Sequence, residues 1–156
     1  RGAKGFPNLT DNDWLYGGNP EQIHQTLVAG RQGQMPPFGA ALGEEKVKDL
    51  ANYVMSLSGK KHDAERAGRG KETFSTVCAA CHGPDGKGNQ AMGAPNLTDK
   101  VWLYGSGEAT IIETVTNGRT NQMPAFKEFL GEDKVHLLAA YVYSLSHGKT
   151  DAAVEK

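Results

Sequence analysis

The chain has 156 residues and a formal net charge of −1, with charges of both signs mixed along its length. That length allows one domain or two very small ones. The charge balance argues against a nucleic-acid-binding protein and against a polybasic membrane anchor, and no apolar run approaches the roughly 20 residues of a transmembrane helix.

The first two predicted elements are helices at Glu21–Ala29 and Glu44–Leu57. Asn19 supplies a favourable helix cap and Pro20 a favourable first-turn residue for the earlier helix. Glycine and proline dominate the residues between the helices, so this stretch, which contains Met35, is predicted to be a loop.

A charged, glycine-bounded segment at residues 59–67 has no apolar periodicity and is predicted to be a linker. Three helices are predicted after it, at Lys71–Ala80, Glu108–Asn117 and Glu132–Leu145. Gly118 is a typical residue just beyond a helix end. No stretch of the sequence predicts a convincing strand.

The sequence repeats itself after a shift of 88 positions, from Gly5 to Gly93. "GFPNLTDNDWLYGG" at Gly5–Gly18 matches "GAPNLTDKVWLYGS" at Gly93–Ser106, and "LGEEKVKDLANYVMSLS" at Leu42–Ser58 matches "LGEDKVHLLAAYVYSLS" at Leu130–Ser146. Shared helical periodicity does not place Gly, Pro and Trp in register. The chain therefore contains a duplicated domain.

The predicted helices, without a convincing strand, indicate an all-α protein. The repeat divides it into four parts: residues 1–58, the linker 59–67, residues 68–148, and a flexible tail at 149–156. The second copy is complete. The first copy has no equivalent of the first predicted helix or of the cysteine-containing stretch that follows it. We expect those parts upstream of Arg1 in a longer parent protein.

Cys78, Cys81 and His82 form a C-x-x-C-H motif, and the chain has no other cysteine. This motif is the attachment signature of c-type haem. One helical turn places two thiols on one side of the macrocycle, where they form thioethers, and the adjacent histidine points at the iron. A thioredoxin-type dithiol and half of a zinc site are the alternatives. A zinc site would need two further ligands, and a thioredoxin dithiol would need a preceding strand.

An electron-carrying haem iron is commonly held between two protein ligands, and a His/Met pair raises its reduction potential. Met35 and Met123 occupy equivalent positions, each within "Q-M-P" in a predicted loop. Met123 belongs to the same copy as His82 and is predicted to be its partner on the iron. Two filled axial positions favour electron transfer over oxygen chemistry.

Several further residues are predicted to support a haem. The Pro95 carbonyl is expected to accept a hydrogen bond from the second ring nitrogen of His82, because such bonds fix the orientation of a ligand. Trp102, Tyr104 and Arg119 are candidate partners for the propionates, although core packing explains Trp102 and Tyr104 equally well. Arg31 is the repeat equivalent of Arg119.

The stretches "CAACHGPDGKGNQAMGAPNLTD" and "NQMPAF" resemble the class I cytochrome c fold. Two such domains with "PNLTDxxWLYGG" and "YVxSLS" in each copy resemble the di-haem cytochrome c subunit of cbb3-type haem-copper oxidases. The resemblance implies one covalent haem c at Cys78 and Cys81, with His82 and Met123 on the iron. It also implies that Met35 is the ligand of a second haem, if the missing N-terminal segment is supplied.

The resemblance further implies a periplasmic electron-transfer subunit that is not itself an enzyme. Its parent would be held to the bacterial inner membrane by an N-terminal anchor. The implied partners are the other oxidase subunits and a donor cytochrome c. An incomplete first copy could also form a domain-swapped dimer with a second chain.

Three other functions stay open on the sequence alone. A soluble di-haem shuttle of the cytochrome c4 type would lack the anchor. A haem enzyme, such as a peroxidase or a thiosulfate-oxidising cytochrome, would need an exchangeable axial position on its iron. A haem-free binding module would stay colourless after passage through the haem-attachment machinery.

Overall fold

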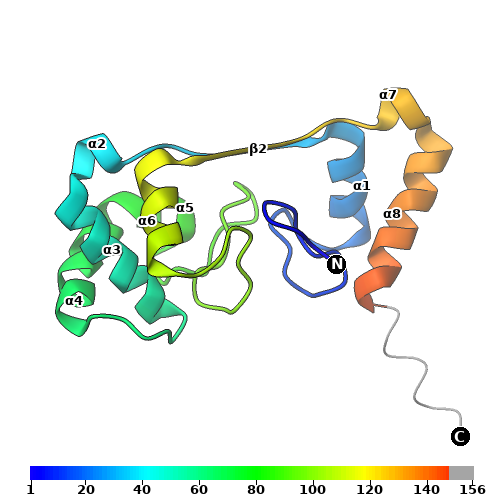
Figure 1. Ribbon diagram of the computed structural model, residues 1–156. Coiled ribbons are helices and arrows are strands. Elements are labelled where there is room, and N and C mark those ends of the chain that lie inside the picture. Colours follow the sequence, from blue (N-terminus) through cyan, green and yellow to red (C-terminus); the bar gives the residue numbers. More distant parts are fainter. Residues whose placement is uncertain (148–156) are drawn as a thin grey trace, which may run out of the picture. The chain divides into compact units, whose positions relative to one another are not determined.

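The computed structural model describes residues 1–147 (Figure 1). The predicted tail at 149–156 lies outside the described residues. Helices dominate the described part of the chain. The helical elements are α1 (Pro20–Ala29), α2 (Gly39–Leu42), α3 (Glu44–Leu57), α4 (Ala64–Thr73), η1 (Phe74–Cys78), α5 (Ala79–His82), α6 (Glu108–Asn117), α7 (Lys127–Leu130) and α8 (Glu132–His147). Among residues 1–147, no helix has both the length and the apolar character needed to cross a membrane.

The helix predicted from Lys71 begins earlier, at Ala64. Its start is set by Asp63, whose side chain accepts hydrogen bonds from the backbone N–H groups of Glu65 and Arg66. The segment predicted as a linker is therefore helical over its last residues. The same helix widens into a π-helical stretch, η1, which ends at the first cysteine, Cys78, and such widened turns often occur at functional sites.

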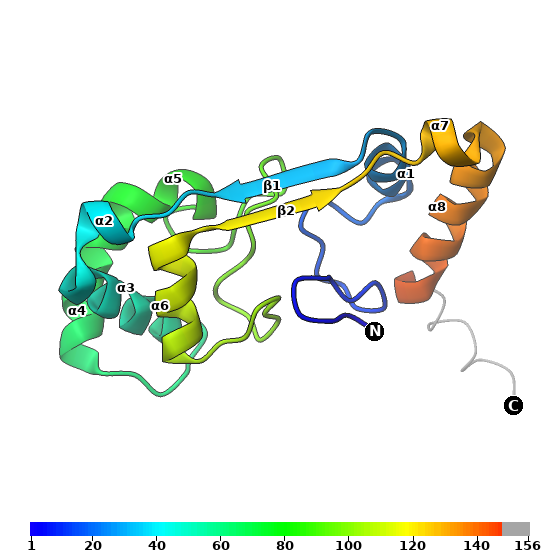
Figure 2. The ribbon, with the colours of Figure 1, turned by 45° about the horizontal axis from the view of Figure 1, so that its top comes forward.

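The prediction of an all-α protein was incomplete, because a two-stranded sheet joins β1 (Arg31–Met35) to β2 (Arg119–Met123). Figure 2 shows the two arrows running in opposite directions. Each strand is a copy of the same polar "GRxxQM" segment. It carries no alternation of apolar and polar residues, so the usual sequence signal of a strand is missing.

Two compact units make up the structure, and neither coincides with a sequence repeat. Of the described residues, the first contains 1–32 together with 121–147, and the second contains Gly33–Thr120. The division falls within β1 and within β2. Each unit is therefore built from parts of both repeats, which exchange their carboxyl-terminal halves within one chain.

The core of the Gly33–Thr120 unit lies where α3 of the first repeat meets α4, η1 and α6 of the second. Leu50 and Phe74 are each 1% exposed, and the Tyr53 ring packs on Phe74 with 5.1 Å between ring centroids. Gly70 lets α4 approach α3 closely, because a Cβ at this position would meet the Asp49 carbonyl. The full buried cluster is Val47, Leu50, Ala51, Val54, Phe74, Cys78, Ile111 and Val115.

The core of the other unit forms between α1 of the first repeat and α8 of the second. Ile23, Leu27, Val135 and Ala139 are its buried residues. These are the repeat equivalents of Ile111, Val115, Val47 and Ala51 in the Gly33–Thr120 unit. The two units thus have equivalent cores, and each core draws its helices from different repeats.

Candidate cofactor site

The two cysteines lie one helical turn apart, at the junction of η1 and α5. Cys78 is buried in the core of the Gly33–Thr120 unit, and Cys81 is half-buried at its edge. Neither forms a disulfide. His82 follows as the last residue of α5 and is only 8% exposed. The i, i+3, i+4 spacing of Cys78, Cys81 and His82 therefore puts two free thiols and a buried imidazole on one face of the helix.

His82 is held by the hydrogen bond that the sequence led us to expect. Its Nδ1 lies 3.1 Å from the Pro95 carbonyl oxygen, which leaves Nε2 available for a metal. Burial lowers the pKa of His82, although the contact with Pro95 opposes the shift. The ring is thus kept in the neutral form that coordinates metals.

The loop after His82 requires glycine at the point where it supports this histidine. Gly88 has φ +84°, and a Cβ there would collide with the Ala94 carbonyl and the Pro95 backbone. Its backbone N–H donates to the His82 carbonyl oxygen at 2.8 Å. The loop from His82 to Pro95 is therefore fixed to this histidine at Gly88, through its backbone, and at Pro95, through its ring.

The environment of the thiols disfavours the dithiol alternative. Burial, with a smaller contribution from Cys81, raises the pKa of Cys78 to about 11. A redox-active cysteine is instead activated by a lowered pKa. Zinc is disfavoured as well, because no group of three or more His, Cys, Asp or Glu side chains in residues 1–147 could hold a metal ion.

Trp102 supplies a polar group that this unit leaves unpaired. Its indole Nε1 is buried and has no hydrogen-bond partner among the described residues, while its ring packs against the cluster that contains Cys78. A buried donor without an acceptor costs free energy. The site therefore offers an N–H group to an anionic ligand atom, which fits a haem propionate.

Met35, not Met123, lies in the unit that contains the cysteines. Met35 packs against the cluster that includes Cys78, together with Phe38. Met123 packs against the cluster of Ile23 and Val135 in the other unit. The structure thus brings the second repeat's C-x-x-C-H motif together with the first repeat's methionine.

The two arginines are held in equivalent ways in the two units. The Arg119 guanidinium lies over the Tyr104 ring at 4.3 Å from its centroid and donates from Nε to Thr114 Oγ1 at 3.0 Å. Arg31 lies over Tyr16 at 4.7 Å and donates from Nε to a threonine hydroxyl at 2.9 Å. Each arginine therefore contacts both the helix before its strand and the loop that precedes that helix.

Comparison with known proteins gives the family of this chain. The family profile described as "Cytochrome C oxidase, cbb3-type, subunit III" matches residues 1–54 and 65–142. The chain belongs to this family. The resemblance expected from the sequence is thereby confirmed, and with it the presence of cytochrome c domains.

Curated relatives of this subunit III chain are about 50% identical to it in sequence over the aligned residues. One is the "Cbb3-type cytochrome c oxidase subunit CcoP" of Rubrivivax gelatinosus, 54% identical over 154 residues, which are 98% of this chain and 50% of that protein. Another is the "Cbb3-type cytochrome c oxidase subunit FixP" of Bradyrhizobium sp. (strain ORS 278), 51% identical and aligned with 95% of this chain and 55% of that protein. The chain spans about half the length of the curated relatives it matches.

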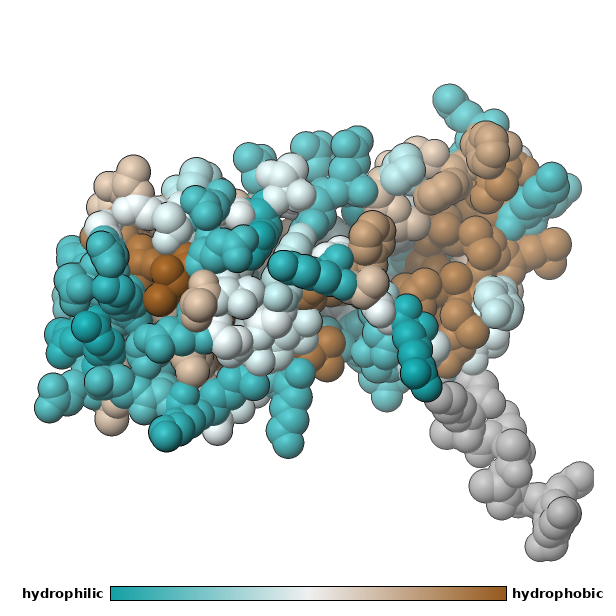
Figure 3. Space-filling view, viewed as in Figure 1, coloured by the Kyte–Doolittle hydropathy of each residue, from teal (hydrophilic) through white to brown (hydrophobic). Residues whose placement is uncertain are grey.

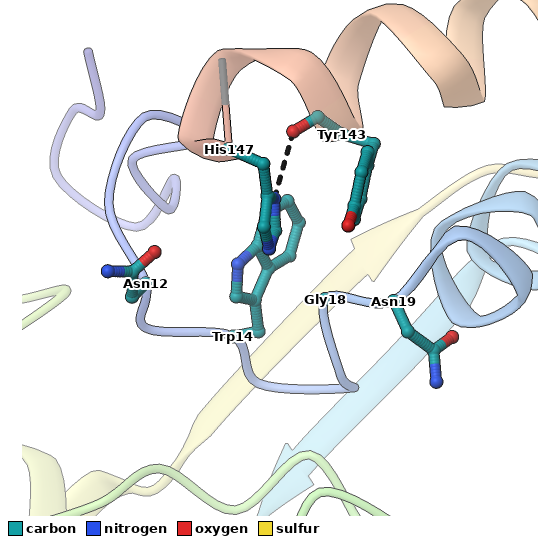
Figure 4. Close-up of a pocket in the computed structure, with 6 residues that line it drawn as sticks. All are labelled: Asn12, Trp14, Gly18, Asn19, Tyr143 and His147. Atoms are coloured by element: carbon teal, nitrogen blue, oxygen red, sulfur yellow. Dashed lines mark hydrogen bonds between the residues drawn. The ribbon is translucent and has the colours of Figure 1, made fainter. Parts of the chain in front are cut away.

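The other unit of this subunit III chain has an aromatic pocket but no attachment cysteines. The pocket has a volume of about 340 Å³ and is lined by Asn12, Trp14, Gly18, Asn19, Tyr143 and His147 (Figure 4). The His147 ring stacks on Tyr143 with 4.0 Å between centroids. Trp14 is the repeat equivalent of Trp102. This pocket is thus the counterpart of the region around Trp102.

An apolar face of α8 is exposed in the same unit. Leu137 is 69% exposed and Tyr141 is 62% exposed. Figure 3 shows apolar residues gathered over this part of the molecule. The repeat equivalents of these two residues are Asp49 and Tyr53, and on α3 this face is covered by α4. In the described structure, α8 has no such covering helix.

Proposed function

We propose that this chain carries one covalent haem c at Cys78 and Cys81, with His82 as a ligand of its iron. The supporting observation is the geometry around His82: a neutral, buried imidazole is fixed at Nδ1 by Pro95, one residue after two free thiols. When bound, the haem supplies an iron that takes up and releases one electron at a time.

The chain's own residues would hold and position the haem. Cys78 and Cys81 would each hold it through one thioether, the product of adding a thiol S–H across a vinyl group. This addition needs no net oxidation or reduction. His82 would hold the iron through Nε2, and Trp102 would donate its indole N–H to a propionate.

A methionine sulfur as the second protein ligand would raise the reduction potential of the iron. Tyr104 and Arg119 are proposed as further haem contacts, because they belong to the same unit as His82. Arg31 would have the same role towards a second haem. Met123 packs in the unit that contains Arg31, so we propose that a second haem in that unit would lie near Met123.

We infer that the protein transfers electrons as a non-catalytic subunit of a haem-copper terminal oxidase. Its family and the names of its relatives support this function. Its partners would be the other oxidase subunits and a donor cytochrome c. Thioether attachment takes place outside the cytoplasm, so we propose a periplasmic location on a parent protein that is anchored to the inner membrane.

The test is to produce the chain, exported, in a host with haem-attachment machinery, and to measure its intact mass and its pyridine haemochrome spectrum. We expect one haem per chain in the wild type and none in the Cys78→Ala/Cys81→Ala variant. A colourless wild-type protein with the mass of the bare polypeptide would disprove the proposal. Carbon monoxide binding to the reduced protein would argue for a haem enzyme instead.

A further inference from the structure

We propose that His24 and His136 form a binding site for a divalent transition-metal ion, preferentially Cu²⁺, which links α1 to α8. The site lies in the unit without the attachment cysteines and does not depend on a bound haem. Helix α1 belongs to the first repeat and α8 to the second, so the bound ion would tie one repeat to the other.

The two histidines face each other from the packed helices of this unit. Figure 1 shows α1 and α8 side by side. The two ring centroids are 6.1 Å apart, and the ring planes meet at 67°. Each histidine directly follows a residue of the buried core, Ile23 on α1 and Val135 on α8. The packing of the two helices therefore fixes the distance between the two histidine backbones, and side chains carried by helices are held more precisely than side chains on loops.

Neither imidazole is engaged by another polar group of the protein. Within residues 1–147, His24 and His136 form no hydrogen bond and no ion pair, and their ring contact is with each other. Each of the other three histidines has a ring nitrogen 2.7–3.1 Å from a backbone carbonyl oxygen: His62, His82 and His147. The ring nitrogens of His24 and His136 are therefore available to an external ligand.

The separation of the rings suits a metal ion held between them. An imidazole nitrogen binds Zn²⁺ at about 2.0–2.1 Å, so two rings on one ion have centroids several ångströms apart. The torsion that turns a histidine ring is broad, so each ring can direct a nitrogen at the ion without any change in the backbone. Imidazole also suits Cu²⁺ and Ni²⁺, and Cu²⁺ has the highest affinity among the divalent ions of the first transition row.

Two carboxylates beside the histidines favour a cation. Glu132 and Asp133 line the same hollow as His24 and His136, and its volume is about 520 Å³. Lys127 Nζ contacts Glu132 at 2.9 Å, whereas Asp133 has no ion-pair partner in the part of the chain that the structure describes. Residues 1–147 contain no ready-made group of three ligands. The carboxylates would therefore act through metal-bound water, while the two histidines bind the ion directly.

The other unit has a different arrangement at the equivalent place. The repeat equivalents of the two histidines are Ile112 and Lys48. Lys48 Nζ contacts Glu44 at 2.7 Å and Glu45 at 3.6 Å, and these glutamates are the equivalents of the two carboxylates beside the histidines. A lysine thus supplies the positive charge in one unit. In the unit with the histidines, a metal ion can supply it.

The test is a calorimetric titration of the full haem-loaded chain with Cu²⁺. We expect one ion to bind at this site in the wild type. His24→Gln and His136→Gln should each weaken this binding by about tenfold or more, because each removes one of two protein ligands. His62→Gln is the matched control, because His62 is exposed and lies in the other unit. It should bind Cu²⁺ as the wild type does.

Thermal unfolding of the same proteins gives a second readout. Saturating Cu²⁺ should raise the Tm of the wild type and of His62→Gln, because an ion that binds only the folded state stabilises it. The Tm of His24→Gln and of His136→Gln should not rise, and without metal both should unfold as the wild type does. Absence of Cu²⁺ binding in the wild type, or binding that persists unchanged in either variant, would overturn the site.

The proposed function and this site fail separately. Thioether attachment leaves no free thiol in the haem-loaded chain, so the cysteines do not compete for Cu²⁺. A wild type without covalent haem would overturn the proposed function alone. The titration is then made with Cys78→Ala/Cys81→Ala, which has no thiol to bind copper, and the same comparison of the histidine variants decides the site.

Discussion

Arg69 donates from its guanidinium Nε to the Asp49 carboxylate at 2.8 Å, across the interface between α4 and α3. Arg66 donates to the same carboxylate at 2.9 Å and also contacts Glu45 at 3.2 Å. Helix α3 belongs to the first repeat and α4 begins the second. This interface therefore joins a helix of the first repeat to a helix of the second within the Gly33–Thr120 unit.

The first prediction concerns the pH dependence of this contact. The Arg69 hydrogen bond is the main cause that holds the pKa of Asp49 below its ordinary value, while burial opposes the shift. A carboxyl group with a lowered pKa in the folded state stabilises the protein above its unfolded pKa of about 3.9, and this stability is lost as the pH falls through the folded pKa. The free energy of unfolding should therefore fall below about pH 4, and fall less in Asp49→Asn.

At neutral pH, Asp49→Asn should lower the free energy of unfolding by about 1–2 kcal/mol, because it weakens charged hydrogen bonds. Denaturant titrations from pH 3 to pH 7 measure both effects. The control is Glu44→Gln, which removes the exposed pair with Lys48 and should change stability little. Parallel pH profiles for wild type and Asp49→Asn would contradict the assignment.

The second prediction compares two glycines of the same helix. Gly70→Ala should destabilise the protein by about 1–3 kcal/mol, because the new Cβ would collide with the Asp49 carbonyl of α3. Gly68→Ala should stabilise it by about 0.5–1 kcal/mol, because Gly68 has open space around it and alanine is the better helix former. Thermal unfolding distinguishes them, and equal effects of the two changes would show that α4 does not pack on α3 at Gly70.

The third prediction uses the unpaired indole of Trp102. Trp102→Phe removes a buried donor that has no partner among the described residues, so the haem-free protein should keep its stability or gain up to about 1 kcal/mol. The haem-loaded protein should instead lose stability, because the propionate then lacks its donor. Unfolding of both forms gives the comparison. A similar loss in both would mean that packing of the ring is the whole role of Trp102.

The fourth prediction concerns the exposed face of α8. Leu137→Lys should change the free energy of unfolding by less than about 0.5 kcal/mol, because Leu137 is 69% exposed. Val135→Ala, two residues earlier and fully buried, should cost about 2 kcal/mol. A large loss in Leu137→Lys would indicate that a helix covers α8, as it would if α4 packed against its own repeat.

Local sequence was enough to predict most helices of this protein. The bounds of α3 and α6 match the prediction, because their apolar periodicity and flanking glycines mark both ends. The hydrogen bond between His82 and Pro95 also followed from the motif. The early start of α4 was missed, although the cap residue Asp63 was visible in the sequence.

The choice of partner between the repeats could not be predicted from the repeat pattern. Two nearly identical segments offer the same apolar surface, so the pattern does not say which α3-like helix joins α4. The deciding signal lies where the repeats differ, at Asp49 against Leu137 and at Asn52 against Ala140. The sheet was missed because its two strands are polar and pair with each other. Their sequences therefore lack the alternation of apolar and polar residues that marks a strand packed on a core.

Two strands of one chain connect the units, and this has a consequence for cutting the protein. The residues between α3 and α4 include the exposed lysine Lys61, where a protease such as trypsin can cleave. One fragment would then hold α1 to α3 and the other α4 to α8, yet each fragment contributes helices to both units. The nicked halves should stay together until they are denatured, and each half made alone should lack a complete core until the other is added.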